Sequence, residues 1–491
     1  MPRRIDGEVQ PGIRWGPFTA RIPFYHFRAE WPEMVQGLIV AGATGLALIP
    51  MLQPYFGLSF EVALAVVIVQ GILISTAPIL FGDPYCHGWV TPSIPLVLAA
   101  MDSMGAGPGA SADITLAVIH AITAFSLTCA FLFLVLGISG LGAMLVRYMP
   151  RAIKSGIILG AAISAFLREF GAGEAITNFL EPHTHLETKS FFLRAPKSCL
   201  VAMTICLLLM FSLPVSKLRN RYRPIAILAG LGLAPGFVAA LIVGHFTGEL
   251  KFDVQWGLQD VAFGQMFQQL SPISSAVGFP GWHHFVEMLP LALVVYIIAF
   301  GDLVTGNELL RDATRYRPDE KVEINPTRTH LNMGIRNACQ AALCGPFPCS
   351  HGMLWTGVQV VVTHRYKQGR RAMDSLFGGI SAYYVWGLPF LFFLKPVTSF
   401  LSPTLPIALS LTLLLTGYAC GYIAMSIVKN PVERGIALMT GMVLALFGAW
   451  QGLLFGIVLT IVLLGKEALA QEPAADHGPS DEEVSDEIGS R

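Results

Sequence analysis

Runs of about twenty apolar residues recur along almost the whole 491-residue chain, and no other feature restricts its fold as strongly. A helix of about 20 residues spans the roughly 30 Å of hydrocarbon in a bilayer. Charged residues make up only 13% of the sequence, whereas soluble domains hold roughly 25%. Inside lipid the backbone must bond to itself, which leaves helices or closed barrels, and runs of this length favour helices. The sequence therefore predicts an all-α polytopic membrane protein.

About fourteen transmembrane segments can be delimited by hydropathy and by Pro/Gly breakers. They cover residues 33–52, 58–81, 90–101, 113–137, 150–170, 196–214, 222–245, 286–310, 329–343, 352–364, 374–398, 403–427, 432–449 and 450–466. The third and tenth segments are too short to cross a bilayer. The polar stretch 249–284 separates two sets of seven segments.

Positive charge predicts the orientation of these segments, because cytoplasmic connections are enriched in Lys and Arg. With residues 1–32 as a cytoplasmic N-terminal segment, every Lys/Arg cluster falls on the cytoplasmic side, and 249–284 becomes an extracytoplasmic connection with Lys251 as its only Lys or Arg. Residues 467–491 are acidic and poor in apolar side chains, so we expect a disordered cytoplasmic tail. The expected location is the cytoplasmic (inner) membrane, with both termini in the cytoplasm.

Two stretches of the chain echo each other. Gly82-Asp83-Pro84-Tyr85-Cys86-His87-Gly88-Trp89-Val90-Thr91-Pro92 precedes the third segment, and Gly345-Pro346-Phe347-Pro348-Cys349-Ser350-His351-Gly352-Met353-Leu354-Trp355-Thr356-Gly357 precedes the tenth. Two further Pro-containing echoes occur at segment starts: the start of the first segment resembles that of the eighth, and the start of the fifth resembles that of the twelfth. Chance is the alternative for any single echo. Together they predict two inverted seven-helix repeats, at 33–248 and 285–466, whose interrupted segments are typical of a transporter's binding site.

The two interrupted segments would meet near the membrane midplane, where two half-helix N-termini favour an anion or a polar group. Broken backbone is tolerated there only when protein covers it or when it lines a wet cavity. The alternative is that these are broken helices that only pack against each other. The expected substrate-binding residues carry ring nitrogens, flat rings or hydroxyl groups: His87, Trp89, Thr91, Ser93, Ser350, His351, Trp355 and Thr356.

Two acidic residues of the eighth segment, Asp302 and Glu308, are the candidates for coupling transport to H⁺ or Na⁺. Ionisable side chains inside a membrane are costly and mark function by default. The alternative for Asp302 is a structural ion pair with Arg336 of the ninth segment. Arg168 and Glu169 are expected at the end of the fifth segment, at the water boundary.

No cofactor is expected. Cys86, His87, Cys349 and His351 form a possible Zn²⁺ or Cu⁺ site, but neither Cys-His nor Cys-x-His has a standard ligand spacing. The eight cysteines lie in or beside apolar segments and are expected to be free thiols.

HExxH, GxSxG and Walker motifs are missing from the sequence, which disfavours an enzyme. The sequence also has no basic tract with interleaved aromatic residues, so no nucleic-acid partner is expected.

Three motifs resemble the seven-plus-seven inverted-repeat transporters with the UraA-like fold, which include SulP anion transporters, uracil and xanthine permeases and bicarbonate/borate exchangers. The motifs are Thr305-Gly306-Asn307 after Asp302, Gly345-Pro346-Phe347-Pro348 before Gly357-Val358, and Met149-Pro150 with Gly156 and Gly160. The resemblance covers about residues 31–466. It implies a core of segments 1–4 and 8–11 that carries substrate between the third and tenth segments. It also implies a gate of segments 5–7 and 12–14 that often makes a homodimer contact, and an elevator motion of the core.

The chain departs from these families at informative positions. Gly352-Met353-Leu354-Trp355 holds no acid where the nucleobase permeases place a glutamate in the tenth segment, and the C-terminal STAS domain usual in SulP proteins is not expected. The expected function is a secondary active transporter for a small anion, either inorganic (such as sulfate or bicarbonate) or a small carboxylate. The alternatives are a nucleobase–proton symporter and an anion channel on the same fold.

Overall fold

The computed structural model describes residues 5–28, 30–37, 45–141, 148–170, 190–222, 224–225, 228, 234–387 and 391–465, and most of these are helical. The side chains of Gln36, Ser216, Arg219, Asn220, Val304, Glu308, Thr356 and 385–387 lie outside the described part. The expected tail at 467–491 is also outside it.

The α-helices of the described residues are α1 (Trp31–Gln36), α3 (Ile49–Phe56), α4 (Phe60–Ile79), α5 (Ile94–Ser103), α6 (Ala112–Ser139), α8 (Arg151–Phe170), α10 (Pro196–Phe211), α11 (Leu213–Arg221), α13 (Ala234–Thr247), α14 (Phe263–Leu270), α15 (Trp282–Arg315), α16 (Pro326–Cys344), α17 (Thr356–Lys367), α18 (Leu376–Gly387), α19 (Lys395–Leu401), α20 (Leu405–Ile427), α21 (Pro431–Phe447) and α22 (Ala449–Leu464). Short 3-10 helices are η2 (Thr91–Ser93), η5 (Phe192–Arg194), η6 (Leu391–Phe393) and η7 (Ser402–Thr404). The strands are β1 (Glu8–Val9), β2 (Ile13–Trp15), β3 (Phe18–Ala20), β4 (Gly88–Trp89), β5 (Glu320–Lys321) and β6 (His351–Gly352).

The mostly helical architecture confirms the predicted fold class, and each expected segment contains a helix. Agreement is closest where Pro or a capping side chain starts the helix: the Ser59 hydroxyl accepts from Val62 N before α4, and Ser111 accepts from Ile114 N before α6. Four helices of the described residues are long and apolar enough to cross a membrane, and three shorter helices are apolar. The count of fourteen spans stays a prediction.

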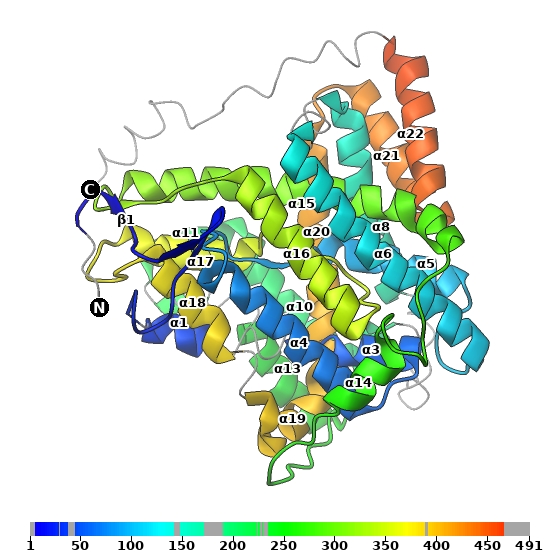
Figure 1. Cartoon of the computed structure of the whole chain (residues 1–491), viewed down its shortest axis with the longest axis horizontal. Helices are drawn as coiled ribbons and strands as arrows, with labels where there is room; N and C mark the ends of the chain where they lie inside the picture. Colours follow the sequence, from blue (N-terminus) through cyan, green and yellow to red (C-terminus); the bar gives the residue numbers. More distant parts are fainter. Residues whose placement is uncertain are drawn as a thin grey trace.

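Helix packing falls into two main groups. In one group α6 packs against α15 and α16, and α4 packs against α16 and α18; in the other, α8 packs against α20 and α21, and α10 packs against α13. Figure 1 shows α21 and α22 side by side at one end, while α1, α17 and α18 gather at the opposite end. The groups touch where α5 and η2 meet α8 and α20, and also where α15 meets α8 and α22. The third segment therefore starts its helix at the boundary between the two groups.

The N-terminal segment folds onto the helices instead of leading loosely into them. β2 and β3 form an antiparallel hairpin, and β1 pairs in parallel with β5, more than 300 residues along the chain. Arg21 is buried, and its guanidinium lies 3.9 Å from the Phe377 ring while Nη1 donates to Gly82 O at 3.4 Å. This segment thereby contacts the residue that directly precedes Asp83.

Gly345, which ends α16, holds a conformation that an alanine would strain. Its φ is +58°, and a Cβ atom there would lie 1.8 Å from Leu270 O. We expect Gly345→Ala to lower the free energy of unfolding by at least about 2 kcal/mol, since both the left-handed backbone and the clash with backbone are unfavourable. Thermal melting in detergent measures the change. Gly421→Ala is the matched control: a Cβ there meets nothing within 4 Å, so its melting temperature should stay the same or rise. Equal melting temperatures for wild type and Gly345→Ala would contradict the expectation.

Candidate functional site

The two interrupted stretches pair directly with each other as strands. β4 and β6 are antiparallel, with Gly88 opposite Gly352 and Trp89 opposite His351. Backbone bonds extend this pairing on both sides, from Val90 N to Ser350 O at 3.0 Å and from Trp355 N to Cys86 O at 2.6 Å. The broken backbone is therefore satisfied by its counterpart in the other stretch, which meets the requirement for irregular backbone within a membrane-spanning region.

Glycine on both strands allows this close crossing. A Cβ on Gly88 would lie 3.0 Å from Trp355 Cβ, and one on Gly352 would lie 3.0 Å from Val90 N. The echoed His-Gly pairs of the sequence thus have a structural reason: each glycine lets the opposite chain approach. After the crossing the chain enters η2 and α5 on one side and α17 on the other, and neither α5 nor α17 has a side-chain N-cap bond.

Amide side chains from neighbouring helices fix the crossing. Asn337 of α16 accepts through Oδ1 from Ser350 Oγ at 3.1 Å and from His351 N at 2.9 Å. Gln359 of α17 accepts from Cys86 N at 2.6 Å. Asn337 and Gln359 are completely buried, so these hydrogen bonds form where water does not compete for them. They hold both stretches to α16 and α17.

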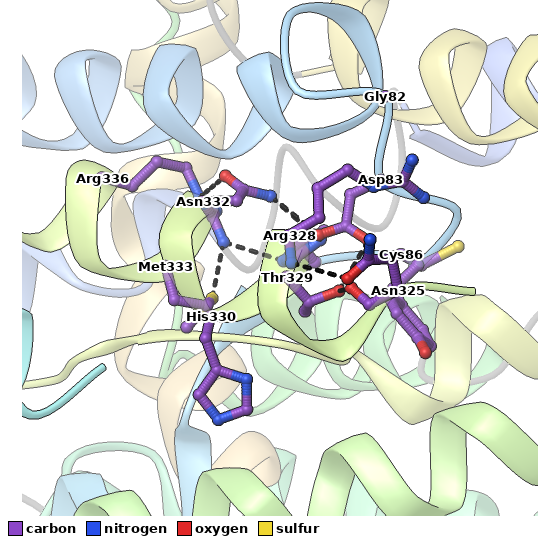
Figure 2. Close-up of polar contacts among 12 residues, drawn as sticks. Gly82, Asp83, Cys86, Asn325, Arg328, Thr329, His330, Asn332, Met333 and Arg336 are labelled. Atoms are coloured by element: carbon purple, nitrogen blue, oxygen red, sulfur yellow. Dashed lines mark hydrogen bonds and ion pairs between the residues drawn. The ribbon is translucent and has the colours of Figure 1, made fainter. Parts of the chain in front are cut away.

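A buried charged cluster lies next to the crossing (Figure 2). Asp83 Oδ1 accepts from Thr329 Oγ1 at 3.0 Å, and Oδ2 lies 3.1 Å from Asn332 Nδ2 and 3.2 Å from His87 Nε2. Arg336 donates through Nε to Asn332 Oδ1 at 2.9 Å, and its Nη2 lies 2.8 Å from His87 Nδ1. Gly352 O also lies 3.2 Å from Nδ1 of His87, but the guanidinium is closer, at 2.8 Å, and can only donate, so Nδ1 accepts and Nε2 carries the proton toward Asp83 Oδ2. The geometry therefore assigns a neutral His87 between a carboxylate and a guanidinium.

Several polar atoms at the crossing are buried and have no hydrogen-bond partner among the described residues. These are both ring nitrogens of His351, Nε1 of Trp89, Nη1 of Arg336 and Nε2 of Gln359. Trp89 and His351 face each other in the strand register, so their side chains leave the ribbon on the same side. The Phe347 ring lies 5.9 Å from Trp89 and 6.5 Å from His351. A buried polar atom without a partner costs about 1–3 kcal/mol, and such a group of them marks a place where a ligand can bond.

The other residues predicted to bind substrate differ in whether their side chains already have partners within the protein. The hydroxyls of Ser93 and Ser350 are used within the protein, the first donating to Val90 O at 2.6 Å and the second to Asn337. Thr91 is half-buried on η2, and Trp355 meets Tyr383 edge-on at 6.2 Å. The backbone of Thr356 starts α17, but its side chain lies outside the described residues.

Two residues of the alternative metal site, Cys349 and His87, bond to other partners. Cys349 Sγ donates to Val90 O at 3.3 Å, and His87 is bonded as above. Within the described part of the chain, no group of three or more His, Cys, Asp or Glu side chains is placed to hold a metal ion. All eight cysteines are free thiols.

Asp302 does not pair with Arg336, which corrects the structural alternative raised from the sequence. Arg336 bonds to Asn332, Met333, His87 and the backbone of Gly352 instead. Asp302 is half-buried on α15 and makes no hydrogen bond or ion pair with another described residue. The side chain of Glu308, on the same helix, lies outside the described residues.

Sequence reasoning missed the polar face of α16 and the role of Asp83. Thr329, Asn332, Arg336 and Asn337 are buried side chains within an expected membrane segment. The spacing of Thr329, Asn332 and Arg336, three and then four residues apart, was the available signal, because polar residues at this spacing fall on one helix face. Asp83 stood inside the echoed stretch, but it has no counterpart in the second copy, so the echo did not select it.

Comparisons with known proteins agree with this architecture. The family model described as "Sulfate permease family" matches residues 39–349, more than half of the chain. The search of curated proteins finds no match. The structure is similar to "The overall structure of SLC26A9", with 13% identity, a TM-score of 0.50, and coverage of 88% of this chain and 65% of that one. It is also similar to the murine Slc26a9 anion transporter in the inward-facing state, with 13% identity, a TM-score of 0.50, and coverage of 89% of this chain and 69% of that one. For "The transmembrane domain of a cyanobacterium bicarbonate transporter BicA" the identity is 13% and the TM-score 0.48, with coverage of 87% of this chain and 97% of that one. At this identity the two likenesses at 0.50 show the fold alone.

Proposed function

The chain belongs to the sulfate permease family, and we propose on that premise that it is a secondary active transporter that moves a small anion across the cytoplasmic membrane. The observation that carries this proposal is the strand crossing of Gly88–Trp89 with His351–Gly352. It brings buried donors without partners to the starts of two short helices. Inorganic anions such as sulfate or bicarbonate and small carboxylates are the proposed cargo.

Donor chemistry supports an anion over a nucleobase. The unpartnered atoms of Trp89, Arg336 and Gln359 are N–H groups, which can only donate. A nucleobase also needs acceptors for its own N–H groups. Asp83, the acidic residue of the first interrupted stretch, is already in contact with Thr329 Oγ1, Asn332 Nδ2 and His87 Nε2. A neutral His351 adds one donor and one acceptor nitrogen, so donors still outnumber acceptors in this set. Sulfate or a carboxylate, which only accept, match it better than a nucleobase does.

The two groups of packed helices support the proposal of an elevator-type motion. The crossing belongs to the group that contains α6, α15 and α16, while α8 and α20 of the other group contact η2 at its edge. In this proposal the first group carries the anion, and the second group forms the gate.

A homodimer through the gate helices also remains a proposal. α21 and α22 expose Phe447 (66%) and Val462 (71%), which face either lipid or a partner.

Asp302 is proposed to couple transport to H⁺ or Na⁺, with Glu308 as the second candidate. We expect Asp302→Asn to abolish gradient-driven accumulation of the anion, because an amide can neither take up a proton nor neutralise a cation. Downhill anion flux should persist. Proteoliposomes with and without an imposed H⁺ or Na⁺ gradient measure both quantities. Glu287→Gln, an exposed acidic residue on the same helix, is the control. Gradient-driven accumulation at the wild-type level in Asp302→Asn would rule out this role.

A thermal-shift screen of the purified protein tests the choice of cargo. The panel is sulfate, bicarbonate, borate, small carboxylates, uracil and xanthine. A ligand at about 100 times its Kd stabilises the folded protein by about 2.7 kcal/mol, so the anion that binds should raise the melting temperature. A shift with uracil or xanthine alone would instead favour the nucleobase–proton symporter. Electrical recordings with conductance far above carrier turnover would favour the anion channel.

A further inference from the structure

Asp83 is placed as a buried, ionised group. Its side chain is completely buried, and its two oxygens receive three donors: Thr329 Oγ1 at 3.0 Å, Asn332 Nδ2 at 3.1 Å and His87 Nε2 at 3.2 Å. A protonated carboxyl would need an acceptor. Asn332 Nδ2 can only donate, and His87 Nε2 donates in the tautomer assigned above, while the single Thr329 hydroxyl hydrogen is shared between Asp83 Oδ1 and Asn325 O at 3.2 Å. The hydrogen bonds therefore favour the charged carboxylate.

Arg336 is the positive charge at the other end of the same cluster. It is 1% exposed, and it reaches Asp83 through two side chains, Asn332 and His87, each of which contacts both charged groups. Figure 2 shows Asn332 between Arg336 and the region of Asp83. The second cation near Asp83, Arg328, has an acidic neighbour of its own: its Nη1 lies 3.8 Å from Glu323 Oε2, and Glu323 is 46% exposed. Asp83 and Arg336 therefore balance each other inside the protein.

This balance determines the charge of the empty site. A lone buried cation strongly resists transfer through a low-dielectric region, and a neutral pair resists it far less. Asp83 and His87 belong to the first interrupted stretch and Arg336 to α16, so all three belong with the strand crossing and would travel with it. A carrier with an uncompensated Arg336 could cross only when an anion is bound, and it would be limited to exchange.

We propose that Asp83 acts as an internal counter-ion for Arg336, which lets the transporter return empty and so carry out net uptake instead of obligatory exchange. This inference rests on the proposed anion transport. The loaded site then carries the charge of the anion itself. Net uptake is therefore electrogenic unless a cation accompanies the anion.

Flux measurements on the full chain in proteoliposomes test this role. The probe is radiolabelled sulfate or, if sulfate does not move, radiolabelled bicarbonate. Net uptake is measured into vesicles free of the anion, and exchange is measured into vesicles preloaded with the same unlabelled anion. Wild type should show both modes. Asp83→Asn should lower the ratio of net uptake to exchange at least about tenfold, because its empty site keeps the Arg336 charge. Asp83→Glu keeps the negative charge and should keep the ratio near that of wild type.

Each result bears on a separate claim. Uptake by wild type only into preloaded vesicles would overturn the inference, and so would an unchanged ratio in Asp83→Asn. Equal loss of both modes in Asp83→Asn, with a normal melting temperature, would also overturn it. Absence of both modes in wild type for every anion would instead refute the proposed function. Asp113→Asn, an exposed residue at the start of α6, should leave both modes unchanged.

Discussion

Arg336→Leu is expected to abolish anion transport and to lower the melting temperature. The substitution removes the donors to Asn332 Oδ1, to His87 Nδ1 and to the backbone of Gly352. It also leaves the Asp83 carboxylate buried without its cation. Removing one partner of a buried charge pair costs roughly 3–5 kcal/mol. Uptake into proteoliposomes and thermal melting in detergent measure the two effects.

A double variant separates the charge from the binding role of Arg336. Arg336→Leu combined with Asp83→Asn leaves no unpaired charge, so we expect melting closer to wild type than in Arg336→Leu alone. Transport should remain absent, because the guanidinium donor to the anion is still missing. Arg315→Leu, an exposed residue at the end of α15, is the matched control and should behave as wild type. Wild-type uptake by Arg336→Leu would refute the role given to this residue.

Asp102→Asn is expected to loosen the contact between the two groups of helices. Asp102 lies in the last turn of α5, which follows η2 in the group that carries the crossing, and Arg168 lies on α8 in the other group. Arg168 Nη1 donates to Asp102 Oδ2 at 3.0 Å, while Nη2 lies 2.8 Å from the Tyr55 hydroxyl, which itself donates to Asp102 Oδ1 at 2.7 Å. Arg168 is 7% exposed and Asp102 23%, so water screens this contact only in part. An elevator motion has to break it.

Hydrogen exchange measures this loosening. A hydrogen bond to a charged group contributes about 1.5–3 kcal/mol, which corresponds to roughly a ten- to hundredfold change in an equilibrium. Amide exchange in residues 94–111 should speed up by about that factor in Asp102→Asn. Tyr55→Phe removes one hydroxyl and keeps the ion pair, so its effect should be smaller. Exchange rates in Asp102→Asn equal to those of wild type would show that the contact does not hold the two groups together.

The helices were predictable because hydropathy and Pro/Gly breaks are local properties of the sequence. α4 (Phe60–Ile79) and α20 (Leu405–Ile427) lie within a few residues of their predicted limits. The strand pair at the crossing was not predictable in the same way. Two-residue strands show no periodic pattern, and their register depends on glycines 264 positions apart meeting in space.

The partners of the charged residues were also beyond the sequence. Arg168 was expected at the water boundary, but that position gave no indication of its partner Asp102, 66 residues earlier. Arg336 was considered as a partner of Asp302, since both lie in neighbouring segments, but it turns toward His87 and Asn332 instead. Depth in the membrane can be read from a sequence, whereas the direction in which a side chain points depends on the packing of the helices.

The most direct test of the account is the affinity of the purified protein for its anion with and without His351. Both ring nitrogens of His351 are buried at the crossing without a partner among the described residues. Losing a hydrogen bond to an anion costs about 1.5–3 kcal/mol. Calorimetric titration of the anion selected by the thermal-shift screen should therefore give a Kd for His351→Ala roughly 10 to 100 times that of wild type. His245→Ala, which alters an exposed histidine on α13, should leave the Kd unchanged. Equal Kd values for wild type and His351→Ala would contradict an anion site at the strand crossing.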